Sequence, residues 1–306
     1  MPPRLCTLPL SLLMLSLAPS AAGQLLTGGG ATFPQPIYSK WIESFERQRP
    51  EFSIRYEPCG SEAGAKRVEE GAFDFAGSDM PLSDPQIARL PFPVVHFPTV
   101  LGAVVPIYHI PGVVADLRVT PEILAGIYLG KIRKWNDPAI RSVNRGVSFP
   151  DREIAVVHRS DGSGTTFVWT DYLSKVSAEW KAAVGSGTTI HWPTGIGVPG
   201  NEGVAHAVSQ TENSIGYVEF IYALEGRLSY ALVRNGSGKF VQAGLDSLGQ
   251  AAPAWRSACQ TIFAFRSRTR PEPRRILSPR SPISWLRRVS PMRERKPPSG
   301  SFCVGC

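Results

Sequence analysis

The chain has few cysteines. Five occur in its 306 residues, and Cys59 is the only one between residues 24 and 252. This body of the chain therefore cannot form an internal disulfide. Cys303 and Cys306 have Cys-x-x-Cys spacing, but a lone pair is weak evidence for a zinc site, and we attribute the spacing to chance. We predict no metal or other cofactor.

The chain also lacks an apolar run of the roughly 20 residues that a membrane-spanning helix needs. Its N-terminal run, Leu8 to Leu17, has about ten residues. The run follows Arg4 and precedes the small residues 18–23, which is the pattern of a cleaved export signal. We predict that residues 1–23 are a signal peptide cut near Ala22 or Gly23. The alternative is a buried N-terminal helix.

Acidic residues are scarce at the C-terminal end. Residues 253–306 hold 12 Lys and Arg against 2 Asp and Glu, whereas residues 24–252 hold 20 against 23, a net charge of −3. The net charge of +8 for the whole chain therefore gives no sign of a nucleic-acid surface on the body, and we predict no nucleic-acid partner. The tail 253–306 is rich in Arg, Pro and Ser, and we predict that it is poorly ordered.

The most informative stretch is the small-residue segment 158–167. It follows an apolar, β-branched run at 154–157, typical of a buried strand, and precedes residues with helical spacing. The N–H groups at a helix start favour an anion. Arg159 offers a planar fork to an oxyanion, and Asp161 can hold that fork in place. The alternative is that Ser and Thr only cap the helix, and that Arg159 and Asp161 form a surface ion pair.

Two catalytic motifs do not fit this segment. A nucleophile elbow requires Gly-x-Ser-x-Gly, whereas Ser163 has a glycine directly on each side. A Walker loop requires a lysine, and the segment has none. Both catalytic interpretations of the segment are therefore weak. A secreted serine hydrolase using Ser163 is the minor alternative, although strand alternation places His158 opposite Arg159.

Small polar turns also follow three other predicted strands, which begin at Leu25-Leu26 and lie at residues 52–56 and 72–76. The second turn leads to Ser61 and the third to Asp79, and either side chain could instead cap a helix. In open α/β sheets, ligands bind outside the carboxyl ends of strands. Four such turns indicate an α/β fold with a ligand site. The apolar run 98–108 is long enough to cross between two lobes.

Together these stretches resemble the periplasmic phosphate-binding protein of the phosphate ABC transporter. The resemblance covers roughly residues 26–252 and rests on residues 28–34, 60–61, 77–83, 127–132, 154–167 and 215–219. It implies an α/β, two-lobed periplasmic-binding-protein-like fold with a ligand cleft between the lobes. Residues 24–98 would begin the first lobe, and residues 99–252 would form the second lobe and the crossover.

The resemblance also implies a monomer in the periplasm that is not an enzyme: it binds inorganic phosphate and delivers it to a membrane permease. Asp79 would accept the proton of hydrogen phosphate, and Asp161 would support Arg159. The other implied phosphate-binding residues are Thr32, Phe33 (through its backbone N–H), Ser61, Arg159, Ser163, Gly164 and Thr165.

Asp79 is expected to decide specificity. Phosphate near neutral pH carries a proton that it can donate to a buried carboxylate, whereas sulfate would place two negative charges face to face. A site built to bond a ligand hydroxyl can reject an analogue lacking it by on the order of 10⁴-fold.

The tail departs from the family pattern. In the family the chain after about residue 252 should return to the first lobe, but residues 253–306 do not resemble that portion and look like another reading frame. The alternative interpretation of the chain is therefore a destabilised, non-functional product of a disrupted coding sequence.

Overall fold

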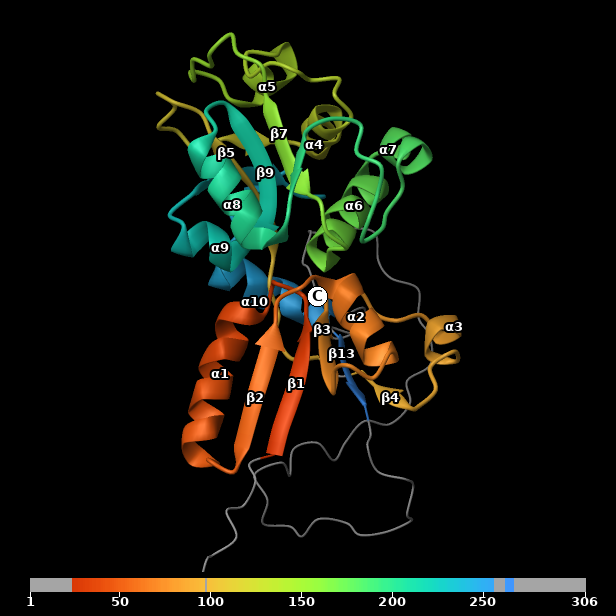
Figure 1. Cartoon of the computed structure of the whole chain (residues 1–306). Coiled ribbons are helices and arrows are strands. Elements are labelled where there is room, and N and C mark those ends of the chain that lie inside the picture. Colours follow the sequence, from red (N-terminus) through yellow and green to blue (C-terminus); the bar gives the residue numbers. More distant parts are fainter. Residues whose placement is uncertain (1–23, 97, 256–261, 267–306) are drawn as a thin grey trace, which may run out of the picture.

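The computed structural model describes residues 24–96, 98–255 and 262–266. They form an α/β protein of two lobes, each built on a five-stranded sheet (Figure 1). The fold class predicted from the sequence is confirmed. The predicted signal peptide and most of the predicted tail lie outside the described residues.

The first lobe has parallel β1, β2 and β3 at its centre. Its strand order is β2-β1-β3-β13-β4, and β13 runs antiparallel to both of its neighbours. In β2, half-buried and exposed residues alternate, as expected for a strand with one face toward the interior. The elements of this lobe are β1 (Gln24–Gly30), α1 (Gln35–Gln48), β2 (Phe52–Glu57), α2 (Ser61–Glu69), β3 (Phe75–Ser78), α3 (Asp84–Ile87), β4 (Val94–Val95) and β13 (Ile262–Arg266).

The second lobe is built on the sheet β10-β5-β9-β7-β8. Every residue of β9 is buried, which fits a central strand covered on both faces. Its elements are β5 (Val104–His109), α4 (Pro121–Tyr128), α5 (Pro138–Val143), β7 (Ala155–Arg159), α6 (Gly164–Val176), α7 (Ala178–Ala183), β8 (Ile196–Val198), α8 (Gly200–Gln210), β9 (Ser214–Glu219), α9 (Phe220–Glu225) and β10 (Ser229–Tyr230).

A small sheet and one helix complete the description. The sheet has the order β12-β11-β6, from β12 (Phe240–Val241), β11 (Leu232–Arg234) and β6 (Arg118–Val119). Helix α10 (Leu245–Trp255) follows, and its Leu248 packs against the buried cluster under β5 and β9. The chain then re-enters the first lobe as β13 (Figure 1).

The two lobes differ in the size of their cores. The second lobe buries three fully enclosed tryptophans, Trp135, Trp169 and Trp180, within a large apolar cluster. Among the described side chains of the first lobe, the cluster has Val68, Phe73 and Ala76 as its buried members. Burial of apolar area is the main favourable term in folding, so we expect the described apolar core to stabilise the second lobe more than the first.

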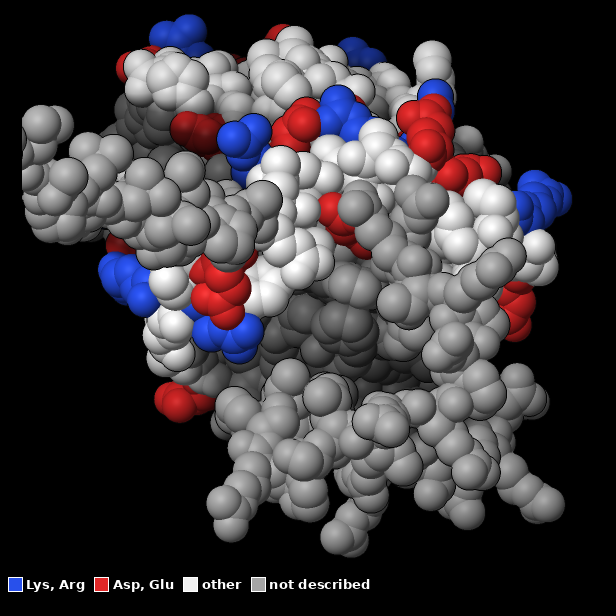
Figure 2. All heavy atoms as spheres, turned by 60° about the horizontal axis from the view of Figure 1, so that its bottom comes forward, with Lys and Arg blue, Asp and Glu red and all other residues white. Residues whose placement is uncertain are grey.

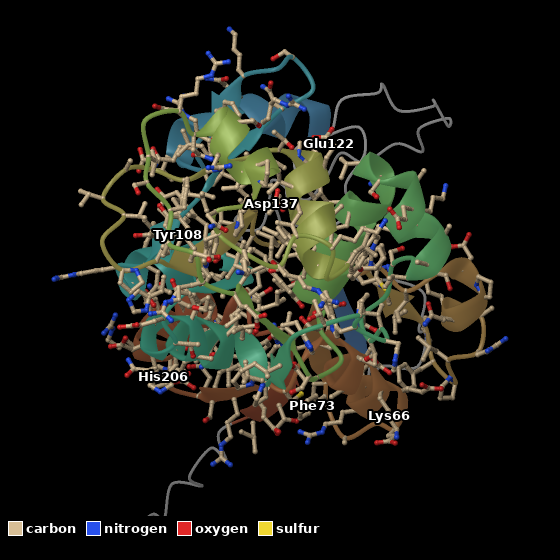
Figure 3. The ribbon with its side chains drawn as sticks, turned by 90° about the horizontal axis from the view of Figure 1, so that it is seen from above. Lys66, Phe73, Tyr108, Glu122, Asp137 and His206 are labelled. Atoms are coloured by element: carbon tan, nitrogen blue, oxygen red, sulfur yellow. The ribbon has the colours of Figure 1, made fainter. Side chains whose placement is uncertain are left out.

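The view from above shows which of the labelled side chains point outward (Figure 3). His206 on α8 and Lys66 on α2 point outward and are exposed, whereas Tyr108 of β5 lies in the interior. On α8 the buried residues are Asn201, Val204 and Val208, a spacing of three and four that places them on one face of the helix.

Two local predictions are confirmed and two are shifted. The strands predicted at 52–56 and 154–157 correspond to β2 and β7. The strand predicted at 72–76 lies later, as β3. The crossing run 98–108 becomes a strand only from Val104.

Parts of the predicted tail belong to two elements of the structure. Pro253 to Trp255 belong to α10, and residues 262–266 form β13, which pairs with β3 and β4. The poor order of residues 253–306 as a whole stays a prediction. A composition averaged over the whole tail hides one short apolar run, which is all that a strand needs. The rest of residues 256–306 lies outside the described ranges.

Three further observations limit the kinds of site that the fold can hold. None of the described helices has the length and hydropathy to cross a membrane. Within the described part of the chain, no three His, Cys, Asp or Glu side chains gather as a metal site would require. Cys59 is a free, partly buried thiol.

Candidate functional site

The predicted site residues meet at the boundary between the lobes. In Figure 1 the carboxyl ends of β2 and β7 point toward this boundary from opposite sides. The first lobe contributes Thr32 and Phe33 in the turn before α1, Ser61 at the first position of α2, and Asp79 directly after β3. The second lobe contributes Arg159 at the end of β7, Ser163 at the N-cap of α6, and Gly164 and Thr165 in the first turn of α6. All eight are buried.

Arg159 is held by Asp161, as predicted. Its Nε donates to Asp161 Oδ1 at 2.7 Å, and its second amino nitrogen bonds to Oδ2, which makes the pair bidentate. The Arg159 side chain is only 1% exposed, so the alternative of a surface ion pair is wrong. Burial raises the pKa of Asp161, but the hydrogen bond and charge of Arg159 outweigh it and hold that pKa below its ordinary value.

Ser61 joins the lobes. Its hydroxyl oxygen accepts the backbone N–H of Gly164 at 3.1 Å. Gly60 is the N-cap of α2, so the alternative role of Ser61 as a cap is wrong. In this arrangement the Gly164 N–H, one of the predicted anion donors, already has a partner. Ser163 does cap α6, because its hydroxyl oxygen accepts the N–H of Thr166 at 3.1 Å.

Asp79 is a buried carboxyl with an unused oxygen. No helix begins at Asp79, since α3 is capped by Ser83, so the alternative role as a helix cap is wrong. The Thr165 hydroxyl approaches Oδ2 at 3.5 Å, whereas Oδ1 has no hydrogen-bond partner among the described residues. Burial raises the pKa of Asp79 to about 7, although the nearby Arg159 charge and the Thr165 hydroxyl lower it.

Asn201, at the start of α8, was not predicted as a site residue. Its side-chain nitrogen donates to the Thr32 hydroxyl at 2.8 Å and to the Thr165 hydroxyl at 3.2 Å. The Thr32 hydroxyl also lies 3.5 Å from an Arg159 amino nitrogen. A lone Asn at a helix start carries no sequence signal of such contacts.

Glu219 is a second buried carboxyl near the site. Its Oε2 accepts the N–H of Ile221 at 2.8 Å and caps α9. Burial raises the pKa of Glu219 to about 8, opposed by backbone N–H groups of Ile221 and Ala103 and reinforced by the nearby Asp79 charge. Glu219 and Asp79 line the same small cavity, together with Phe33 and Thr165.

The space between these groups is tight. The cavity has room for about one water molecule. Phe33 lies against Gly102, where an added Cβ would come within 2.7 Å of the Phe33 ring and would also meet a Glu219 oxygen. Gly102 is therefore needed to let the crossover segment pass between Phe33 and Glu219. An anion would enter by replacing contacts that now join the lobes.

The site offers little to a serine hydrolase. Among the described residues, no hydrogen bond joins Ser163 to a histidine. The nearest histidine in sequence, His158, has its Nδ1 3.0 Å from the Arg159 carbonyl oxygen and stacks on Trp192 with 4.7 Å between ring centroids. Burial lowers the His158 pKa, but without contact to Ser163 the ring cannot act as its base.

Comparison with known proteins identifies the family. The family model described as "PBP superfamily domain" matches residues 17–260. A phosphate-binding protein PstS of Pasteurella multocida is 46% identical over 252 residues, which cover 81% of this chain and 72% of the relative. A phosphate-binding protein PstS of Xylella fastidiosa is 44% identical over 228 residues, covering 74% of this chain but 62% of that relative.

A solved structure has the same fold. A putative phosphate ABC transporter substrate-binding protein with bound phosphate from Clostridium perfringens superposes with a TM-score of 0.58 at 22% identity, covering 80% of this chain and 87% of the other. At this identity the likeness establishes the fold alone, which is that of the periplasmic binding proteins.

Proposed function

The chain belongs to the PBP superfamily and, within it, to the phosphate-binding proteins of the phosphate ABC transporter, and we propose from this that it captures inorganic phosphate and delivers it to the transporter's permease. The observation that carries the proposal is the convergence of Arg159, three hydroxyls and the start of α6 between the lobes. A buried cation beside helix N–H groups and hydroxyl donors suits a small, doubly charged anion.

Phosphate would be held from both sides. Thr32, Ser61 and the Phe33 N–H would donate from the first lobe, and Arg159, Ser163, Gly164 and Thr165 from the second. The Ser61 oxygen accepts a bond from Gly164, which leaves the Ser61 hydrogen for the ligand. On binding, the Gly164 N–H would donate to a phosphate oxygen in place of the Ser61 oxygen, so this N–H would have a hydrogen-bond partner both with and without the ligand.

Asp79 would choose phosphate over sulfate. Its Oδ1 is buried and has nothing among the described side chains to bond with. The proton of hydrogen phosphate supplies that partner, whereas sulfate offers none and leaves two unshielded acceptors in contact. A carboxyl with a pKa of about 7 in the free protein would give up its proton when the ligand brings one.

We propose further that the protein works as a periplasmic monomer, catalyses no reaction and binds no nucleic acid. On the face shown in Figure 2, Lys and Arg alternate with Asp and Glu among the described residues, and neither sign forms a continuous patch. A nucleic-acid surface would require clustered basic residues. The periplasmic location rests on the predicted signal peptide and on the family.

Thermal unfolding of the purified protein tests the proposal. A ligand that binds only the folded state stabilises it by about 2.7 kcal/mol at 100 times its dissociation constant. Millimolar phosphate should raise the unfolding midpoint by several degrees, and sulfate should not. A cooperative transition that phosphate leaves unmoved would overturn the proposal.

Two further results of the same experiment are informative. Arg159→Ala should abolish the phosphate shift, because the main cation of the site is lost and Asp161 is left unpartnered. The absence of any cooperative transition in the unmodified protein would support the alternative of a destabilised product of a disrupted coding sequence.

A further inference from the structure

We infer that Asn201 is a positioning residue that aims the Thr32 and Thr165 hydroxyls at the bound anion from the two lobes. The inference rests on the proposed function and assigns a role to a side chain outside the predicted binding set. Asn201 has an exposed fraction of 0% and lies in the first turn of α8. It is thus placed behind the binding groups and acts through them.

The orientation of the Asn201 amide is fixed by a backbone group. Its Oδ1 accepts the N–H of Glu219, at the end of β9, at 3.0 Å. An N–H can only donate, so the oxygen of the amide must face β9 and its NH₂ must face the site. The assignment of oxygen and nitrogen therefore follows from chemistry at this position.

The two hydrogens of this NH₂ are directed at two hydroxyls. One points to Thr32 Oγ1 at 2.8 Å in the first lobe, and the other to Thr165 Oγ1 at 3.2 Å in the second. The backbone N–H of Asn201 lies 3.4 Å from the same Thr32 oxygen. One amide group thereby links the β1–α1 turn to the start of α6.

The consequence concerns the direction of the hydroxyl hydrogens. A hydroxyl that accepts a bond from an NH₂ group must turn its own hydrogen elsewhere. For Thr32 the other neighbour within 3.5 Å, an Arg159 amino nitrogen, is also a donor. For Thr165 the remaining neighbour is the Asp79 carboxyl, at 3.5 Å. Neither threonine can therefore donate back to Asn201. The Thr32 hydrogen is left for an anion, and the Thr165 hydrogen, which points to Asp79 Oδ2 in the structure, is kept on the side of the site.

Replacement of the amide separates this role from packing. In Asn201→Asp the shape is kept, but an ionised carboxylate accepts from both hydroxyls, turns their hydrogens away from the ligand and adds a negative charge. In Asn201→Ala the hydroxyls are free to rotate. Once protonated, the carboxyl introduced by Asn201→Asp would donate one hydrogen bond again, so only this variant should recover as the pH falls.

Phosphate affinity is measured by calorimetry between pH 8 and pH 5. The affinity of each variant is compared with that of the unmodified protein at the same pH. At pH 8 we expect Asn201→Ala to weaken phosphate binding by about 10-fold, which corresponds to the loss of one hydrogen-bond donor to the ligand. Asn201→Asp should weaken it by about 100-fold or more, which corresponds to the loss of two or more donors. Asn201→Asp should regain part of its affinity at pH 5. Asn201→Ser, which keeps one donor, should lie between the unmodified protein and Asn201→Ala.

Asn144 provides the matched control. It is buried in the second lobe with three hydrogen bonds to backbone atoms of Arg118 and Ile140, away from the site. Asn144→Ala should lower the unfolding midpoint without changing phosphate affinity. If the unmodified protein binds phosphate and the Asn201 variants bind equally well, or if Ala and Asp weaken binding equally at every pH, the inference is overturned. If the unmodified protein does not bind phosphate, the proposed function falls as well.

Discussion

At the scale of the residue, Asp79 and Glu219 are neutral or partly neutral carboxyls in a site proposed for an anion. Both line one small cavity, and burial raises their pKa values to about 7 and about 8. A protonated carboxyl spares the free protein the repulsion of two buried charges. The site can thus stay empty of ligand without an uncompensated pair of negative groups.

The first prediction concerns selectivity. Asp79→Asn should lower the ratio of phosphate to sulfate affinity by about 100-fold or more, because an amide can donate to sulfate where a carboxylate repels it. Competition binding of both anions measures the ratio. Glu62→Gln, which removes an exposed charge at the lobe boundary, is the matched control and should keep the ratio. An unchanged ratio in Asp79→Asn would remove Asp79 from the selectivity mechanism.

The second prediction is a loss of stability as the pH rises. The ordinary pKa values of these acids are 3.8 and 4.5, and the folded values are about 7 and about 8. Between these limits the unfolded chain is ionised while the folded protein keeps its protons, so stability falls with rising pH. Without phosphate the unfolding midpoint should be higher at pH 5 than at pH 8.

The variant that checks this pH dependence is Glu219→Gln, which has no proton to lose. Its midpoint should fall less between pH 5 and pH 8 than that of the unmodified protein, in thermal scans at constant ionic strength. An identical pH dependence in the two proteins would mean that the pKa of Glu219 is the same in the folded protein and in the unfolded chain.

At the scale of the element, the start of α6 is one of the places where the two lobes are in contact. Gly164 is the first residue of this helix, and a Cβ there would come within 2.6 Å of Asp79 Oδ2 and would also meet the Ser61 hydroxyl. The glycine is therefore required for closure of the lobes, whereas a helix start by itself accepts many residues.

The third prediction follows from that contact. Gly164→Ala should weaken phosphate binding by about 10-fold or more, because the lobes can no longer reach the closed geometry, and each lobe should still fold. Gly244→Ala is the control, since an added Cβ there has open space. Calorimetry gives the affinities and thermal scans check folding. Equal affinities in the two variants would show that closure tolerates the extra methyl group.

Local sequence signals predicted the turns well. Strand ends, small residues and Arg159 beside Asp161 lie within short segments, and the structure brings them together as expected. Asn201 could not be predicted, because its contacts join residues from three distant segments and depend on tertiary geometry. Strand β13 was missed for another reason, since its five residues are embedded in a tail whose average composition disfavours structure.

At the scale of the whole molecule, the two lobes have unequal protection from water. In the first lobe Trp41 and Phe45 of α1 remain 47% and 39% exposed, and the buried cluster of the described side chains is small. The tryptophan-rich core lies in the second lobe. Local opening should therefore be easier in the first lobe.

The fourth prediction is a difference in amide hydrogen exchange. Without ligand, β1 and β2 should exchange faster than β5 and β9, and phosphate should slow exchange in the first lobe more than in the second because it ties the weaker lobe to the stronger. Hydrogen exchange with mass spectrometry measures both effects. Uniform protection of the four strands would contradict the inequality drawn from the cores.

The pairing of β3 with β13 has a consequence for synthesis. The second sheet is drawn from one continuous stretch, β5 to β10, whereas the first sheet needs a strand that follows all of it. A chain emerging from the ribosome with its N-terminus first can complete the later lobe before the earlier one. Until residues 262–266 have been synthesised, the edge of β3 is unpaired and can form hydrogen bonds with a strand of another chain. The first lobe is therefore the first to be synthesised and the last to complete its sheet. The interval before β13 is available is the period in which the chain is most exposed to aggregation.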